Sequence, residues 1–241
     1  MKIAIAQIQP VKGDLSANLD IHLHWIRIGA AESMDVIFFP ELSLTGYEPK
    51  LASKLSLSTE DDFWQPIRYV CDELGVTAGL GAPIHTQAGI YIGMLIFQPG
   101  RPLLSHAKQI LHPDEEAYFV KGQHQLLIPL QGEIIAPAIC YESLQRSHIE
   151  AAKVSGATLY LASVAKHGKG MEQAKEFFSR ASKDLGLPVL LCNCIGPADD
   201  FVAAGGSAAW NRSGQLLEQL GNQSQGLLLF DTLTESSLIL T

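Results

Sequence analysis

The chain has 241 residues and a mass of 26.1 kDa; 47% of the residues are hydrophobic and only 17% are charged. Its formal net charge of −8 argues against nucleic acid or an anionic membrane surface as the main partner, because polyanions bind positively charged surfaces. The hydrophobic content excludes a mostly disordered chain and leaves a compact, mildly acidic protein with a sizeable core.

The first residues predict a strand and not a targeting signal. Polar Gln7 and the nearby Pro10 interrupt the opening apolar residues, so the chain start lacks the apolar segment and cleavage site of a signal peptide. No window reaches the roughly 18 uncharged apolar residues typical of a transmembrane helix. The four cysteines are too few and too irregularly spaced for a disulfide framework. We therefore expect a cytoplasmic protein.

The N-terminal half of the chain predicts several strands and two helices. Residues 14–31 form the first helix, because apolar side chains recur at helical spacing at positions 19, 23, 26 and 30. The second helix spans about 59–74, with Thr59 and Asp62 as a capping pair and Gly75 at its end. The expected strands are 2–7, 36–39, 76–83, 89–97, 102–107, 123–129 and 132–138.

Beyond Cys140 helices and strands alternate. We expect helices over about 143–155 and 171–185, each followed by a glycine. Helices at both ends of a run of strands in mixed order indicate an α+β or α/β layered architecture. Because no linker or repeat interrupts the pattern, we expect a single domain over 1–241. The remaining expected strands are 158–163, 189–193 and short strands between 206 and 231.

Three strand ends carry candidate catalytic side chains, since layered α/β enzymes place reactive groups just past the carboxyl ends of strands. Glu41 follows an apolar strand, where it is either desolvated or paired; a loop carboxylate that caps a backbone group is the alternative. Lys108 ends another strand, where a solvated lysine is the ordinary interpretation. Cys140 lies between a strand and a predicted helix, as in a nucleophile elbow with its thiolate favoured at a helix N-terminus; a buried inert cysteine fits equally well.

Four sequence blocks in order resemble the motifs of the nitrilase, or carbon-nitrogen hydrolase, superfamily. The blocks are Phe-Pro-Glu-Leu-Ser-Leu-Thr-Gly-Tyr at 39–47, Lys-Gln-Ile-Leu at 108–111, Glu-Glu-Ala-Tyr-Phe at 115–119 and Ile-Cys-Tyr-Glu at 139–142. The resemblance spans nearly the whole chain. It implies an α+β fold, a four-layer α-β-β-α sandwich with mixed sheets.

The resemblance also assigns site residues. The family's Glu-Lys-Cys triad falls on Glu41, Lys108 and Cys140. Its additional active-site glutamate falls on Glu115, which lies three residues before the Tyr of a Tyr-Phe pair; the adjacent Glu116 is the alternative. No metal or other cofactor is implied. The resemblance places four further residues near the substrate, namely Tyr47, Tyr141, Glu142 and Val164.

The implied reaction is hydrolysis of a non-peptide C–N bond in a small amide or N-carbamoyl compound. Glu41 accepts the thiol proton of Cys140, and the thiolate attacks the carbonyl carbon. Lys108 and the backbone N–H of Tyr141 stabilise the oxyanion, while Glu115 positions Lys108 or the substrate nitrogen. Ammonia or an amine leaves, and water hydrolyses the acyl-thioester.

Two departures from the family pattern concern the substrate and not the reaction. Residues 145–150 read Gln-Arg-Ser-His-Ile-Glu where many relatives carry Phe-Pro-Glu, and His-Pro at 112–113 replaces a common Leu-Pro. Lys166, His167 and Lys169 are candidates for contact with a substrate carboxylate, and a solvated basic loop is the alternative.

The expected partners are a small-molecule amide, water and a second copy of the chain in a homodimer. The apolar C-terminal residues 238–240 are expected to dock, either on their own chain or on a second subunit. Two other functions stay open. One is a glutaminase that supplies ammonia to a separate synthetase; the other is a non-catalytic binding protein on this fold, whose mark would be loss of a triad residue.

Overall fold

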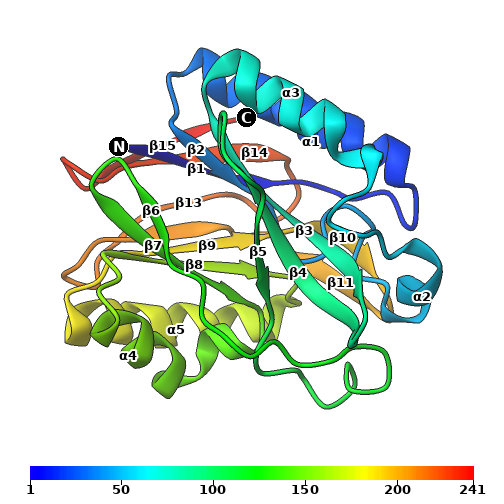
Figure 1. Ribbon diagram of the computed structural model, residues 1–241. Helices are drawn as coiled ribbons and strands as arrows, with labels where there is room; N and C mark the ends of the chain where they lie inside the picture. The colour runs from blue at the N-terminus through cyan, green and yellow to red at the C-terminus, as the bar shows by residue number, and fades with distance from the viewer.

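A seven-stranded mixed sheet forms one half of the computed structural model of residues 1–241 (Figure 1). Its central strands β1, β2 and β3 run parallel to one another, and the outer strands pair antiparallel. The strand order is β15-β14-β1-β2-β3-β4-β5. The bounds are β1 (Lys2–Gln7), β2 (Val36–Phe38), β3 (Thr77–Thr86), β4 (Gly89–Phe97), β5 (Leu104–Ala107), β14 (Gly226–Asp231) and β15 (Ser236–Leu240).

A six-stranded sheet forms the other half, in the order β13-β12-β9-β8-β7-β6. Strands β7, β8 and β9 are parallel, so their carboxyl ends lie at one edge. The bounds are β6 (Ile128–Leu130), β7 (Glu133–Ile139), β8 (Leu159–Val164), β9 (Val189–Asn193), β12 (Ala208–Trp210) and β13 (Leu216–Gln219).

Helices cover the outer face of each sheet, and apolar side chains fill the three interfaces. Helices α1 (Leu15–Ala31) and α3 (Gln65–Leu74) lie over the seven-stranded sheet, and α4 (Arg146–Val154) and α5 (Gly168–Leu185) lie over the six-stranded sheet (Figure 1). Separate buried clusters fill the space between the sheets and the space beneath each helical layer. The expected α-β-β-α sandwich with mixed sheets is confirmed. No helix is long and apolar enough to cross a membrane.

The face that α1 buries differs from the predicted stripe. Its most buried side chains include Asn18, His22 and Trp25, while Leu19 and Leu23 are only partly buried beside them. The polar members are tolerated because each is hydrogen-bonded: the Asn18 amide donates to backbone carbonyls, and His22 contacts Ser43 Oγ at 2.9 Å. The spacing of apolar residues therefore predicted the position of the helix correctly, but it did not predict which face of the helix is buried.

Two predicted helix starts are wrong. The helix expected from residue 59 begins at Gln65, after the 3-10 turn η2 (Asp62–Trp64), and Asp61 accepts the capping hydrogen bond from Phe63. Pro66 explains the late start, because proline is tolerated only in the first turn of a helix. The helix expected from residue 143 begins at Arg146, since Gln145 is extended after the 3-10 turn η3 (Glu142–Leu144).

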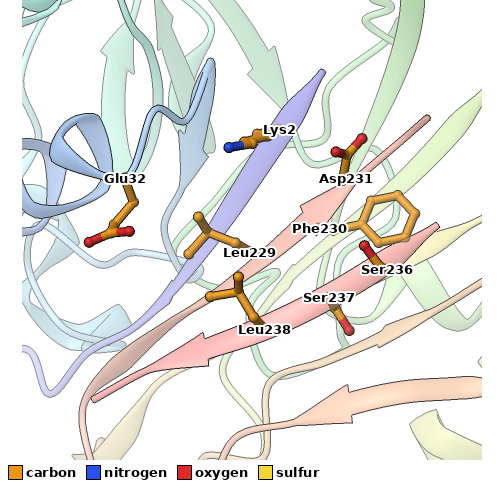
Figure 2. A pocket seen from close by; sticks show the side chains of 8 residues that line it. All are labelled: Lys2, Glu32, Leu229, Phe230, Asp231, Ser236, Ser237 and Leu238. Atoms are coloured by element: carbon orange, nitrogen blue, oxygen red, sulfur yellow. The ribbon is translucent and has the colours of Figure 1, made fainter. Parts of the chain in front are cut away.

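The C-terminal segment docks on its own chain, as strand β15 at the edge of the seven-stranded sheet. It pairs antiparallel with β14, and Leu229 lies opposite Leu238. Figure 2 shows these two leucines side by side in a shallow hollow that Lys2 and Glu32 also line. The pairing covers the apolar strand β14, and the expected docking is confirmed.

Four short elements were not predicted. Strands β10 (Ile195–Ala198) and β11 (Phe201–Ala204) form a separate antiparallel hairpin. The segment after β2 contains the 3-10 turn η1 (Pro49–Leu51) and the single-turn helix α2 (Ala52–Leu55). The hairpin and η1 both lie beside the candidate site described next.

Candidate active site

Glu41, Lys108 and Cys140 come together from the ends of three strands. Glu41 lies in the turn after β2, Lys108 directly follows β5, and Cys140 directly follows β7. The first two belong to the seven-stranded sheet and the third to the six-stranded sheet, so the site lies where the two sheets face each other.

Lys108 is a buried cation held between two carboxylates. Its Nζ donates to Glu41 Oε1 at 2.7 Å and to Glu115 Oε1 at 2.6 Å, and all three side chains are almost completely buried. Burial alone would lower the pKa of Lys108, but the two carboxylates outweigh it and raise that pKa above its ordinary value. The lysine is therefore charged at neutral pH.

Glu41 keeps one carboxylate oxygen free. Oε1 accepts the hydrogen bond from Lys108, whereas Oε2 is buried and accepts from no N–H or O–H group; a weak hydrogen bond with the Cys140 thiol also acts on the carboxylate. Burial raises the pKa of Glu41, although the charge of Lys108 and, to a smaller extent, the weak hydrogen bond with the thiol offset part of this effect. A desolvated carboxylate with a free oxygen is suited to accept and return a proton.

Cys140 adopts a left-handed backbone conformation, with φ of +47°. Its thiol lies 3.8 Å from the carbonyl oxygen of Ala165. Burial raises the pKa of Cys140 to about 11; the negative charge of Glu41 adds to this, and Lys166 offsets part of it. The expectation that a helix N-terminus favours the thiolate is wrong, because α4 begins only at Arg146. The thiol is therefore protonated at neutral pH and requires a base.

Glu115, and not Glu116, lies within the site. Glu115 Oε1 also accepts from the Tyr47 hydroxyl at 2.8 Å, and Oε2 accepts from the backbone N–H of His112 at 2.8 Å. Glu116 is exposed and pairs with Lys121 at 2.8 Å. Glu115 is thus held from both sides, in a position that fixes the buried lysine.

A cavity of about 400 Å³ opens over Cys140. Tyr47 and Tyr141 line it, as the sequence predicted, and so do Lys166 and His167 from the basic loop; Lys169 does not. No group of three or more His, Cys, Asp or Glu side chains is arranged to hold a metal ion.

The hairpin β10–β11 supplies cavity residues that sequence reasoning missed. Asp199, Asp200 and Phe201 line one wall, and the Phe201 ring packs against Tyr47 with centroids 5.7 Å apart. Lys50 in η1 donates to Asp199 at 2.9 Å and ties the hairpin to the segment that follows Tyr47. The Asp-Asp pair before Phe201 was the available turn signal.

Two residues expected near the substrate do not line the cavity. Val164 is completely buried in the apolar cluster beneath α4 and α5, and the next residue, Ala165, lines the cavity instead. Glu142 is also completely buried, and its carboxylate is occupied by other protein groups. The position in the motif predicted proximity to the nucleophile but not the direction of the side chain.

Gly81 in β3 packs directly against the turn that carries Glu41. A Cβ atom there would lie 2.4 Å from the Pro40 carbonyl oxygen and 2.5 Å from the Leu42 nitrogen. We expect Gly81→Ala to displace this turn and to lower the free energy of unfolding by about 1–3 kcal/mol, measured by thermal denaturation. Gly221→Ala, where the new methyl group meets nothing within 4 Å, is the control and should leave Tm unchanged. Equal Tm values for the two variants would contradict the close packing.

Similarity to known proteins identifies the family of this chain. A carbon-nitrogen hydrolase family model matches residues 2–234. The glutamine-dependent NAD(+) synthetases of Thermotoga maritima and Aquifex aeolicus are 27% and 28% identical over 90% of this chain, which spans only 39% and 40% of their lengths. The NitN amidase from Nesterenkonia sp. AN1 has a TM-score of 0.87 at 25% identity, covering 96% of this chain and 92% of its own. The chain belongs to the carbon-nitrogen hydrolase family.

Proposed function

We propose that the protein hydrolyses the C–N bond of a small amide through an acyl-thioester on Cys140. The observation that carries the proposal is the grouping of a protonated thiol, a carboxylate with a free oxygen and a buried lysine beneath one cavity. An amide resists hydrolysis because its carbonyl is weakly electrophilic and its nitrogen leaves poorly, and this grouping addresses both difficulties.

Glu41 acts first as the general base. Its free Oε2 takes the thiol proton as the sulfur of Cys140 attacks the carbonyl carbon and a tetrahedral adduct forms. The same carboxyl group then gives that proton to the departing nitrogen, so ammonia or an amine leaves and the thioester remains. In the second half, Glu41 takes a proton from water as the water oxygen attacks the thioester carbon. The C–S bond then breaks, the acid leaves, and the proton passes from Glu41 back to the sulfur of Cys140.

Lys108 stabilises the negative charge on the carbonyl oxygen in both halves. It is a buried cation, and a charge interacts more strongly with a nearby oxyanion in a low-dielectric interior than in water. The backbone N–H of Tyr141 donates no hydrogen bond within the chain, which leaves it available as a second donor. Glu115 holds Lys108 in place through the 2.6 Å bond, so it serves as a positioning residue.

The relatives support two kinds of amide substrate, a simple amide and glutamine. The similar solved structure is that of an amidase, which favours a simple amide. The curated relatives are glutamine-dependent synthetases, which favours the second candidate, a glutaminase that delivers ammonia to a separate synthetase. The cavity wall supports this candidate as well, because Lys166 and Asp200 form no ion pair in the chain and match the charged ends of an amino acid.

A substrate screen tests the proposal. Neutral amides, glutamine and N-carbamoyl amino acids are compared by ammonia release, and intact-mass analysis follows acyl groups on Cys140. We expect turnover of at least one amide together with an acyl adduct on Cys140. Absence of both across the panel would favour the non-catalytic binding protein. Faster turnover of glutamine than of neutral amides of equal size would favour the glutaminase.

We also propose that the chain acts as a single-domain homodimer in the cytoplasm, with only the amide and water as further partners. Light scattering of the purified protein tests the assembly. A mass of about 26.1 kDa in solution would contradict the dimer.

A further inference from the structure

The Glu142 carboxylate lies directly behind the nucleophile and accepts four hydrogen bonds. Oε1 accepts from the backbone N–H of Ile139 at 2.8 Å and contacts His106 Nε2 at 3.1 Å. Oε2 accepts from the backbone N–H groups of Gln109 at 2.5 Å and Ile110 at 3.2 Å. We call these four bonds the Glu142 clamp.

The clamp joins the two segments on which the proposed chemistry depends. Ile139 immediately precedes Cys140 at the end of β7, and Gln109 and Ile110 immediately follow Lys108 after β5. These strands belong to different sheets, so no ladder of backbone hydrogen bonds fixes one segment relative to the other. A single carboxylate supplies direct bonds between them.

Burying a carboxylate between the two segments is unfavourable unless both of its oxygens accept hydrogen bonds. Glu142 is completely buried, and an unpaired buried charge strongly destabilises a fold. Burial alone would raise the pKa of Glu142, but the hydrogen bond and charge of His106, the charge of His148 and the Ile139 N–H together lower it. The ionised form is therefore stable, and it is the form that accepts on both oxygens.

We propose that Glu142 is a positioning residue that sets the location of Lys108 relative to the Cys140 thiol; this inference rests on the proposed function. The motif resemblance suggested a substrate contact, but the side chain does not reach the cavity. Its role is to hold the lysine ammonium where the oxyanion forms. Misplacement of a catalytic group by about 1 Å can cost about 100-fold in rate.

Glutamine cannot replace the carboxylate in this clamp. Each oxygen faces N–H donors, so an amide would turn its own NH₂ group either toward Ile139 or toward the pair Gln109 and Ile110. One of the two segments would lose its acceptor and move. Aspartate keeps both acceptor oxygens on a side chain one carbon shorter, so it should hold the segments loosely.

The test compares Glu142→Gln with Tyr160→Phe in the full chain. Tyr160 shares a 2.8 Å hydrogen bond with His148 in the same buried region but makes no bond to Glu142. With activity normalised to the folded fraction, we expect Glu142→Gln to lower kcat about 100-fold with KM unchanged. Tyr160→Phe should lower Tm but leave kcat unchanged. Equal kcat values for Glu142→Gln and the wild type would overturn the inference.

Two further measurements keep the inference testable. If Glu142→Gln does not fold, Glu142→Asp is used for the test. We expect kcat to fall about tenfold at constant KM, and an unchanged kcat would refute the clamp.

The rate of Cys140 alkylation by iodoacetamide requires no substrate, and we expect it to fall in both variants. If the wild type cleaves no amide while this rate still falls, the proposed function fails and the clamp stands. If the wild type is active and the rate is unchanged, the clamp fails.

Discussion

Replacing Lys108 by methionine is expected to lower the free energy of unfolding by about 3–5 kcal/mol and to lower kcat by at least about 10²–10³-fold. The stability loss follows because the side chains of Glu41 and Glu115 would remain buried without the cation that binds both. The rate loss follows because the proposed oxyanion would lose its charged donor. Chemical denaturation and steady-state kinetics measure the two effects.

The stability loss should depend on pH. Without Lys108, burial and the negative charge of Glu115 raise the pKa of Glu41 above its value in the unfolded chain. The folded variant then binds more protons than the unfolded chain, so its stability is retained at low pH and lost as pH rises through the raised pKa of Glu41. The deficit relative to wild type should be smaller at pH 5 than at pH 8.

Two controls separate the effects of Lys108→Met. Lys121→Met removes a surface lysine whose pair with Glu116 is solvated, and it should leave both Tm and kcat unchanged. The double variant Lys108→Met with Glu115→Gln removes one unpaired carboxylate, so it should regain stability without regaining activity. Recovery of activity would refute the role proposed for the lysine.

Cys140→Ala is expected to abolish turnover, with a loss of about 10⁴-fold or more, because no other group can form the thioester. The fold should remain, since the side chain lies at the floor of an open cavity and alanine loses only the sulfur. Ammonia release measures the first effect and circular dichroism the second.

Cys71→Ala is the matched control for the nucleophile. Cys71 is also a free cysteine, buried in α3 beneath the other helical layer, and burial raises its pKa to about 12. We expect it to react more slowly with iodoacetamide than Cys140 and its replacement to leave kcat unchanged. A Cys140→Ala variant that keeps wild-type turnover would refute the covalent mechanism.

The three principal site residues were predicted from the motif resemblance, because their places at the ends of apolar strands left a loop carboxylate, a solvated lysine and an inert cysteine as alternatives. Glu41 and Lys108 come after strands with distinct bounds, and the structure brings both together with Cys140. Their electrostatic state was not predictable. The raised pKa of Cys140 depends on burial by residues from several distant segments, which no local pattern contains.

Two other features escaped prediction because they depend on tertiary contacts. The hairpin β10–β11 is too short for a period-2 pattern to stand out, and a glycine and a proline interrupt its first strand. The inward direction of Glu142 depends on backbone donors 32 and 33 residues earlier in the chain. Motif spacing gives a residue's neighbours along the chain but not the groups that its side chain meets.

Strand β15 affects how readily the protein aggregates. It covers β14, in which Leu227, Leu228 and Phe230 are completely buried. A chain shortened to residue 235 would leave β14 as an open, apolar sheet edge, the kind of surface on which other chains add as strands and precipitate. Strand β15 therefore protects the edge of β14 from pairing with other chains, and this role is independent of catalysis.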